Sequence, residues 1–107
     1  MTFKDLLNEY LKEFNCNSKK ISELTNISPS VISRYRSGQR RPEINSIQTD
    51  KIINAIFELG NNKYKKEDIK NNILNSLKKD DFNYENFSKN LNDLINILKI
   101  NLKDMSK

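Results

Sequence analysis

Two short helices joined by a tight turn are the strongest constraint that this sequence places on its fold. A segment over residues 18–25 lies between Asn17, a good N-cap, and Asn26, which suits the left-handed conformation that ends a helix. Ser28 and Pro29 then supply an N-cap and a first-turn proline for the next helix. With so short a turn, the two helices are expected to pack as a compact pair.

The second helix of this pair is expected over 29–37, with Gly38 as its stop signal. At about 100° per residue, Ile32 and Tyr35 lie on one side and are predicted to pack into the core. The opposite side presents three hydroxyl side chains around one arginine: Ser30, Ser33, Arg34 and Ser37. Such small side chains allow a helix to approach another surface closely, whereas a merely solvated face of this chain would use Lys, Glu and Asn.

Helical signals elsewhere predict an all-α fold. Thr2 and Asp5 form a capping pair for a helix over 2–14, and further helices are expected over 46–58, 66–79 and 86–99. Only two Gly and two Pro, with 31% charged residues, also favour helices over sheets. One core around the second to fourth helices is expected to bury Ile21, Leu24, Ile32, Tyr35, Ile47, Ile52, Ile53, Ile56 and Phe57.

The arginines of this chain are confined to one segment. All four, Arg34, Arg36, Arg40 and Arg41, fall within eight positions, while the other fifteen basic residues are lysines spread from end to end. Residues 15–42 hold six basic side chains against Glu23 alone, so they carry the whole net charge of +5. A guanidinium group offers paired donors that match phosphate and the major-groove edge of guanine. This concentration indicates a surface that binds a polyanion.

The stretch ISELTNISPSVISRYRSGQRRP, residues 21–42, resembles the Cro/phage-repressor-type (Xre, lambda-repressor-like) helix-turn-helix DNA-binding domain. The resemblance extends over about residues 3–59. A small residue in the first helix of the pair, Ser22, is followed by matches at Ser28, Ile32, Ser33, Arg34, Gly38, Arg40 and Pro42. It implies a compact four- to five-helix domain followed by extra C-terminal helices.

The resemblance also implies which residues contact double-stranded DNA. The residues that would read bases lie in the first turns and the middle of the 29–37 helix; they are Pro29, Ser30, Ser33 and Arg34. Phosphate contacts fall to Ser18, Lys19, Ser28, Ser37, Gln39, Arg40 and Arg41. Pro29 and Ser30 stand where longer polar readers are frequent. Arg36 stands where an acidic residue is frequent, and it is expected to meet Glu9 or Glu13 on the first helix.

The chain divides into three parts. Residues 1–60 are predicted to be the helix-turn-helix domain, and residues 61–84 a linker with a bracing helix that carries Ile69, Ile73, Leu74 and Leu77. Shifting the sequence by 84 residues aligns 3–23 with 87–107, with six identities and corresponding apolar positions. The C-terminal segment over 85–107 is therefore either the truncated start of a second helix-turn-helix repeat or an unrelated amphipathic helix, and it is our candidate for a homodimer contact.

These patterns favour a sequence-specific transcriptional regulator, a repressor, that binds double-stranded DNA. The alternatives are an antitoxin with a second, toxin-binding surface, or a protein–protein assembly module that uses the same fold. No catalytic constellation, metal site or cofactor is expected, because the chain lacks His and its lone Cys16 suits a small buried thiol. Without a long apolar run or signal peptide, we expect the prokaryotic cytoplasm or nucleoid.

Overall fold

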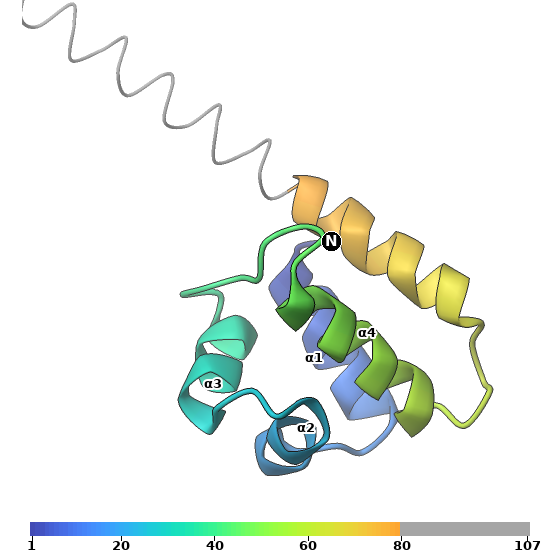
Figure 1. Ribbon diagram of the computed structural model, residues 1–107, viewed down its shortest axis with the longest axis horizontal. Coiled ribbons are helices and arrows are strands. Elements are labelled where there is room, and N and C mark those ends of the chain that lie inside the picture. Colours follow the sequence, from blue (N-terminus) through green and yellow to red (C-terminus); the bar gives the residue numbers. More distant parts are fainter. Residues whose placement is uncertain (80–107) are drawn as a thin grey trace, which may run out of the picture.

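The computed structural model of the protein describes residues 1–79, which are helical and contain no strand (Figure 1). Four helices follow one another as α1 (Phe3–Glu13), α2 (Ser18–Thr25), α3 (Pro29–Ser37) and α4 (Ile47–Leu59). A fifth helix occupies residues 66–79, yellow to orange in Figure 1. The all-α prediction is confirmed for these residues, and the predicted helix over 86–99 lies outside them.

The helix ends use the side chains that the sequence indicated. Asp5 N–H donates to Thr2 Oγ1 at 3.2 Å, and Lys20 N–H donates to Asn17 Oδ1 at 2.8 Å. Asn26 adopts the left-handed conformation with φ 57° at the end of α2. The other non-glycine residues with positive φ among the described ones are also asparagines: Asn15, Asn45, Asn61 and Asn62. Asparagine tolerates this conformation better than most side chains, so these residues mark the turns.

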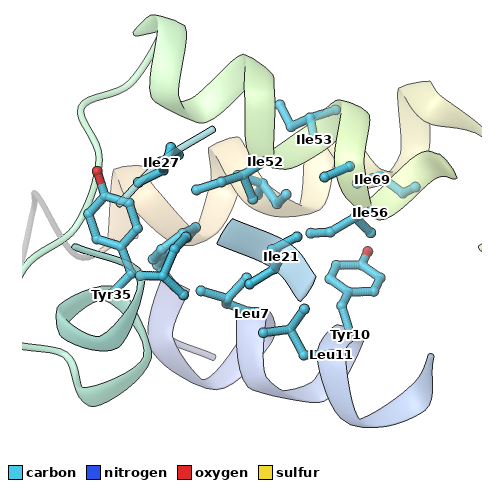
Figure 2. Packing of buried hydrophobic residues seen from close by; sticks show 14 of the residues in the cluster. Leu7, Tyr10, Leu11, Ile21, Ile27, Tyr35, Ile52, Ile53, Ile56 and Ile69 are labelled. Atoms are coloured by element: carbon cyan, nitrogen blue, oxygen red, sulfur yellow. The ribbon is translucent and has the colours of Figure 1, made fainter. Parts of the chain in front are cut away.

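One apolar core joins all five helices (Figure 2). Helices α1 and α4 supply half of its buried residues, and α2 and α3 close one side with Ile21, Ile32 and Tyr35. The fully buried large side chains are Phe3, Leu7, Leu11, Ile21, Ile32, Ile52, Ile56, Ile69, Ile73 and Leu77. Truncating one such residue to alanine typically costs about 2–5 kcal/mol, so this cluster is the main source of stability.

The fifth helix packs against this core and braces it. Ile69, Ile73 and Leu77 lie at successive helical turns and are each at most 1% exposed. Asn72 Nδ2 also donates to the Tyr10 hydroxyl on α1 at 3.2 Å. The predicted inward facing of these three residues is confirmed, whereas Leu74 is half-buried.

Two apolar residues that were predicted to be buried are exposed instead. Ile47 is 69% exposed. It is the first residue of α4, which begins directly after Ser46, and the face of α4 that packs into the core contains Thr49, Ile52 and Ile56. At 100° per residue, Ile47 falls on the opposite side of α4.

Leu24 on α2 is 38% exposed, and its predicted inward facing is also wrong. Ser22 and Thr25 face the core in its place, and Ile27 in the turn fills the adjoining apolar space. The buried hydroxyls remain satisfied, because Ser22 donates to the Ile27 carbonyl and Thr25 donates to the Ile21 carbonyl, each at 2.6 Å. Small side chains with local hydrogen bonds therefore allow the turn to pack closely on α2.

Candidate nucleic-acid interface

The exposed face of α3, defined by Ser30, Ser33, Arg34 and Ser37, lies opposite the side of the helix that enters the core. Ile32 and Tyr35 are 0% and 2% exposed, which confirms the predicted facing of this helix. The Val31 N–H contacts Ser28 Oγ at 3.4 Å, and Gly38 ends the helix with φ 82°. Local residues thus set where α3 starts and ends, and the burial of Ile32 and Tyr35 sets the rotation of the helix.

The turn between α2 and α3 is held by hydroxyl groups that sequence reasoning did not assign. Besides the bond from Ser22 to the Ile27 carbonyl, Ile27 N–H donates to Thr25 Oγ1 at 3.3 Å. These bonds tie the turn to the last residues of α2 and fix how α3 leaves it. The pattern of small hydroxyl residues at 22 and 25 was the available signal, because side chains larger than these would separate the two helices.

Arg36 does not meet Glu9 or Glu13, and that prediction is wrong. Its Nε donates to Asn8 Oδ1 at 2.8 Å, and its Nη1 donates to Ser18 Oγ at 2.7 Å. The amide of Asn8 returns a bond to the Arg36 carbonyl at 2.9 Å. Glu9 follows Asn8 directly but projects about 100° further around α1, and Glu13 lies five residues further along, so the half-buried guanidinium meets Asn8 instead. Arg36 therefore bridges α1, α2 and α3 instead of extending into solvent.

The loop after α3 folds back over the end of the helix. Ser37 Oγ donates to the Arg34 carbonyl at 3.1 Å, and Arg40 N–H donates to the same carbonyl at 3.3 Å. Gln39 N–H contacts Ser37 Oγ at 3.4 Å. Two of these bonds satisfy the Arg34 carbonyl, one of those that a helix end leaves unpaired, and they hold the backbone of Arg40 against the end of α3.

Arg41 is half-buried and has a structural contact that the sequence did not suggest. Its Nη1 donates to the carbonyl of Leu77 on the fifth helix at 3.3 Å. The following Pro42 is buried. Arg41 therefore connects the loop to the fifth helix, whereas Arg40 is exposed.

The predicted contact residues form one contiguous region around α3 and the start of α2. Those that are exposed are Lys19, Ser28, Pro29, Ser30, Ser33, Arg34, Ser37, Gln39 and Arg40. Ser18 is half-buried and accepts the hydrogen bond from Arg36. Lys19 and Lys20 stand in the first turn of α2 beside this region. The exposed basic side chains outside α3 therefore come from the first turn of α2 and from the loop after α3.

The chemistry of the remaining polar groups is unremarkable. Cys16 is buried, and burial raises the pKa of its thiol, which keeps it protonated and unreactive. Across residues 1–79, no group of three or more His, Cys, Asp or Glu side chains is placed to hold a metal ion. None of the helices in that range combines the length and the apolar character of a membrane span.

Comparison with known proteins gives no match to any protein family, curated protein or solved structure.

Proposed function

We propose that this protein is a sequence-specific double-stranded-DNA-binding transcriptional regulator of the lambda-repressor-like helix-turn-helix type, and that it acts as a repressor. In this proposal α3 is the recognition helix and enters the major groove, while the first turn of α2 and the loop after α3 contact the phosphate backbone. The observation that carries it is the exposed face of α3, where hydroxyl side chains surround Arg34 and basic groups flank the helix.

The geometry of this face fits a groove. Ser30, Ser33 and Ser37 are short, so nothing on this side of α3 holds the helix away from base edges. Arg34 is exposed in the middle of the face and keeps its full reach, which suits a bidentate contact to guanine O6 and N7. The two anchors behind it, Ile32 and Tyr35, fix the rotation of the helix, so that Arg34 is presented in one direction.

Backbone contacts are assigned to the flanking groups. Lys19 in the first turn of α2 and Arg40 in the loop after α3 are both exposed. Arg41 also donates to the Leu77 carbonyl, so we assign it a smaller share of phosphate binding than Arg40. With about four phosphates neutralised per subunit, log K should fall with log salt at a slope of about −3 to −4.

The experiment is a selection of bound sites from random duplex DNA with the full chain, Arg34→Ala, Arg34→Lys and Arg40→Ala. Both Arg34 variants should lose preference at one base position, at a cost of about 1–3 kcal/mol, because lysine keeps the charge but not the planar donor pair. Arg40→Ala should weaken all duplexes alike and reduce the salt slope by roughly one.

Lys70→Ala is the matched control. It removes one positive charge from an exposed position on the fifth helix, away from α3. Its site preference and salt slope should equal those of the unmodified chain. If the full chain selects no sequence, or if Lys70→Ala weakens binding as much as Arg40→Ala, the assignment of the DNA surface to α3 is wrong. An assembly module or a protein-binding antitoxin surface would then explain the exposed face better.

A further inference from the structure

A groove runs between α1 and the fifth helix, and none of the predicted DNA-contact residues lines it. It consists of two adjoining hollows of about 360 and 210 Å³, which share the side chains of Leu6, Glu9 and Asn72. Lys79 lies at one end of the groove and Tyr64 at the other. The groove therefore follows the fifth helix over most of its length and reaches the last described residue.

The lining of the groove includes apolar side chains that residues 1–79 leave partly uncovered. Leu6 packs against the core but is only half-buried. Met1 and Tyr64, at the two ends of the groove, are exposed. They are two of the four exposed large apolar side chains among the described residues, so half of that set lies along one groove. Apolar groups gathered in this way indicate an interaction surface.

The end of the groove near Tyr64 is acidic. Glu9, Glu13 and Asp68 line this hollow, and its described lining contains no basic residue. Lys63 and Tyr64 donate hydrogen bonds to Glu13. Glu9 and Asp68 make no hydrogen bond or ion pair within residues 1–79. Carboxylates without partners beside apolar side chains favour an occupant that brings an apolar face and a positive charge to this end.

The chain itself supplies a segment of matching length and pattern. The helix that the sequence predicts over 86–99 would extend about 20 Å, against about 17 Å for the fifth helix between Asp68 and Lys79. Apolar residues spaced by four, three and four positions would form one stripe along it, which contains Phe87, Leu91, Leu94 and Leu98. Lys99 follows directly at the end of this stripe.

The connection between the two helices favours the segment of the same chain over that of a second copy. Only six residues, 80–85, separate the fifth helix from the predicted one, which is within the usual range for a turn between antiparallel neighbouring helices. Because the groove reaches Lys79, a helix that turns back after this point runs along it toward Tyr64.

We propose that residues 86–99 fold back as a helix, antiparallel to the fifth helix of the same chain, and occupy this groove. In that direction the apolar stripe packs against Leu6, and Lys99 comes level with Asp68 at the acidic end. Asp93 falls on the side of the helix away from the stripe. The inference goes beyond the proposed function and does not depend on DNA binding. It gives the segment a partner within its own chain instead of in a homodimer.

The experiment is methyl NMR on the full, DNA-free chain. The methyl groups of Leu6 should show nuclear Overhauser contacts with those of Leu91 or Leu94. A sample that mixes labelled and unlabelled chains separates contacts within one chain from contacts between two chains. Contacts seen only between chains would assign the segment to a homodimer, and a complete lack of contacts would mean that the segment does not occupy the groove. Either result would overturn the proposal.

Hydrogen exchange of the amides in 86–99 measures how strongly the segment is docked. Leu91→Asp places a charge in the apolar stripe and should lower the protection of these amides at least about tenfold, because an isolated helix of this length is marginal in water. Asn92→Asp is the matched control: it adds the same charge at the neighbouring position, which faces away from the stripe, and should change protection less than about twofold. Equal protection in the two variants would contradict docking through this stripe.

A charge exchange tests the direction of the helix. Asp68→Lys should lower the protection of 86–99 about twofold to fivefold, and adding Lys99→Asp should restore it, because the pair is then present with its charges reversed. If Lys99→Asp restores nothing, the two side chains are not neighbours and the antiparallel arrangement is wrong. DNA is absent throughout, so failure of the proposed function would leave these results unchanged.

Discussion

Replacing Arg36 with alanine should destabilise the fold without changing which DNA sequence is preferred. The substitution removes the bonds to Asn8 and Ser18 and leaves the polar groups of both residues without their partner. Hydrogen bonds to a charged group contribute about 1.5–3 kcal/mol when shielded from water. Arg36 is half-buried, so we discount this to about 1 kcal/mol for each bond and expect a loss of about 2 kcal/mol.

The measurement is urea unfolding followed by circular dichroism, with thermal unfolding as a second readout. A loss of 2 kcal/mol corresponds to a fall in Tm of roughly 8–16 °C for a domain of this size. Asn8→Ala should have a similar effect, because it breaks the bond to the guanidinium and the one to the Arg36 carbonyl. Arg34→Ala is the matched control: it is exposed on the same helix and should change stability by less than about 0.5 kcal/mol.

A double-mutant cycle makes the reasoning refutable. If Arg36 and Asn8 act through each other, the double variant should cost about 1–2 kcal/mol less than the sum of the single variants. Strict additivity would show that the two side chains do not interact in solution. A loss below about 0.5 kcal/mol in Arg36→Ala would likewise refute the bridge between the three helices.

Three further predictions concern stability. Ile32→Ala should cost about 2–5 kcal/mol in chemical unfolding, whereas Ile47→Ala, at an exposed position, should cost less than about 0.5 kcal/mol; similar losses would contradict the facing of α4. Gly38→Ala should lower the free energy of unfolding by about 1 kcal/mol or more, because φ is 82° there and the added Cβ would press on the side chain of Lys4. Unchanged stability would argue against the left-handed conformation at this helix end. Hydrogen bonds from Lys63 and then Tyr64 lower the pKa of Glu13 in the folded protein. The contribution of Glu13 to the free energy of unfolding is therefore present above its unfolded pKa of about 4.3 and is lost as pH falls through the lower folded pKa. Glu13→Gln should flatten the dependence of stability on pH in that window, and an unchanged dependence would refute the contact.

The sequence by itself was sufficient to place the helices over residues 1–79. Asn17, Ser28 and Gly38 act on backbone groups only a few positions away, so their role follows from residue type and order. The facing of α3 could be predicted for the same reason, since Ile32 and Tyr35 are three residues apart and leave the opposite side for Ser33 and Arg34. The use of asparagines such as Asn45 in left-handed turns was not recognised, because the chain is rich in this residue throughout.

Only the tertiary structure decided which partner each long side chain has. Arg36 and Asn8 are 28 residues apart, and Arg41 and Leu77 are 36 apart. Their contacts exist because helix packing brings those segments together, which no local pattern encodes. The same holds for Ile47, whose apolar side chain is exposed because the start of α4 and the position of its neighbours rotate another face inward. Local hydrogen bonds depend on the order of residues, whereas burial and distant contacts depend on how whole helices pack.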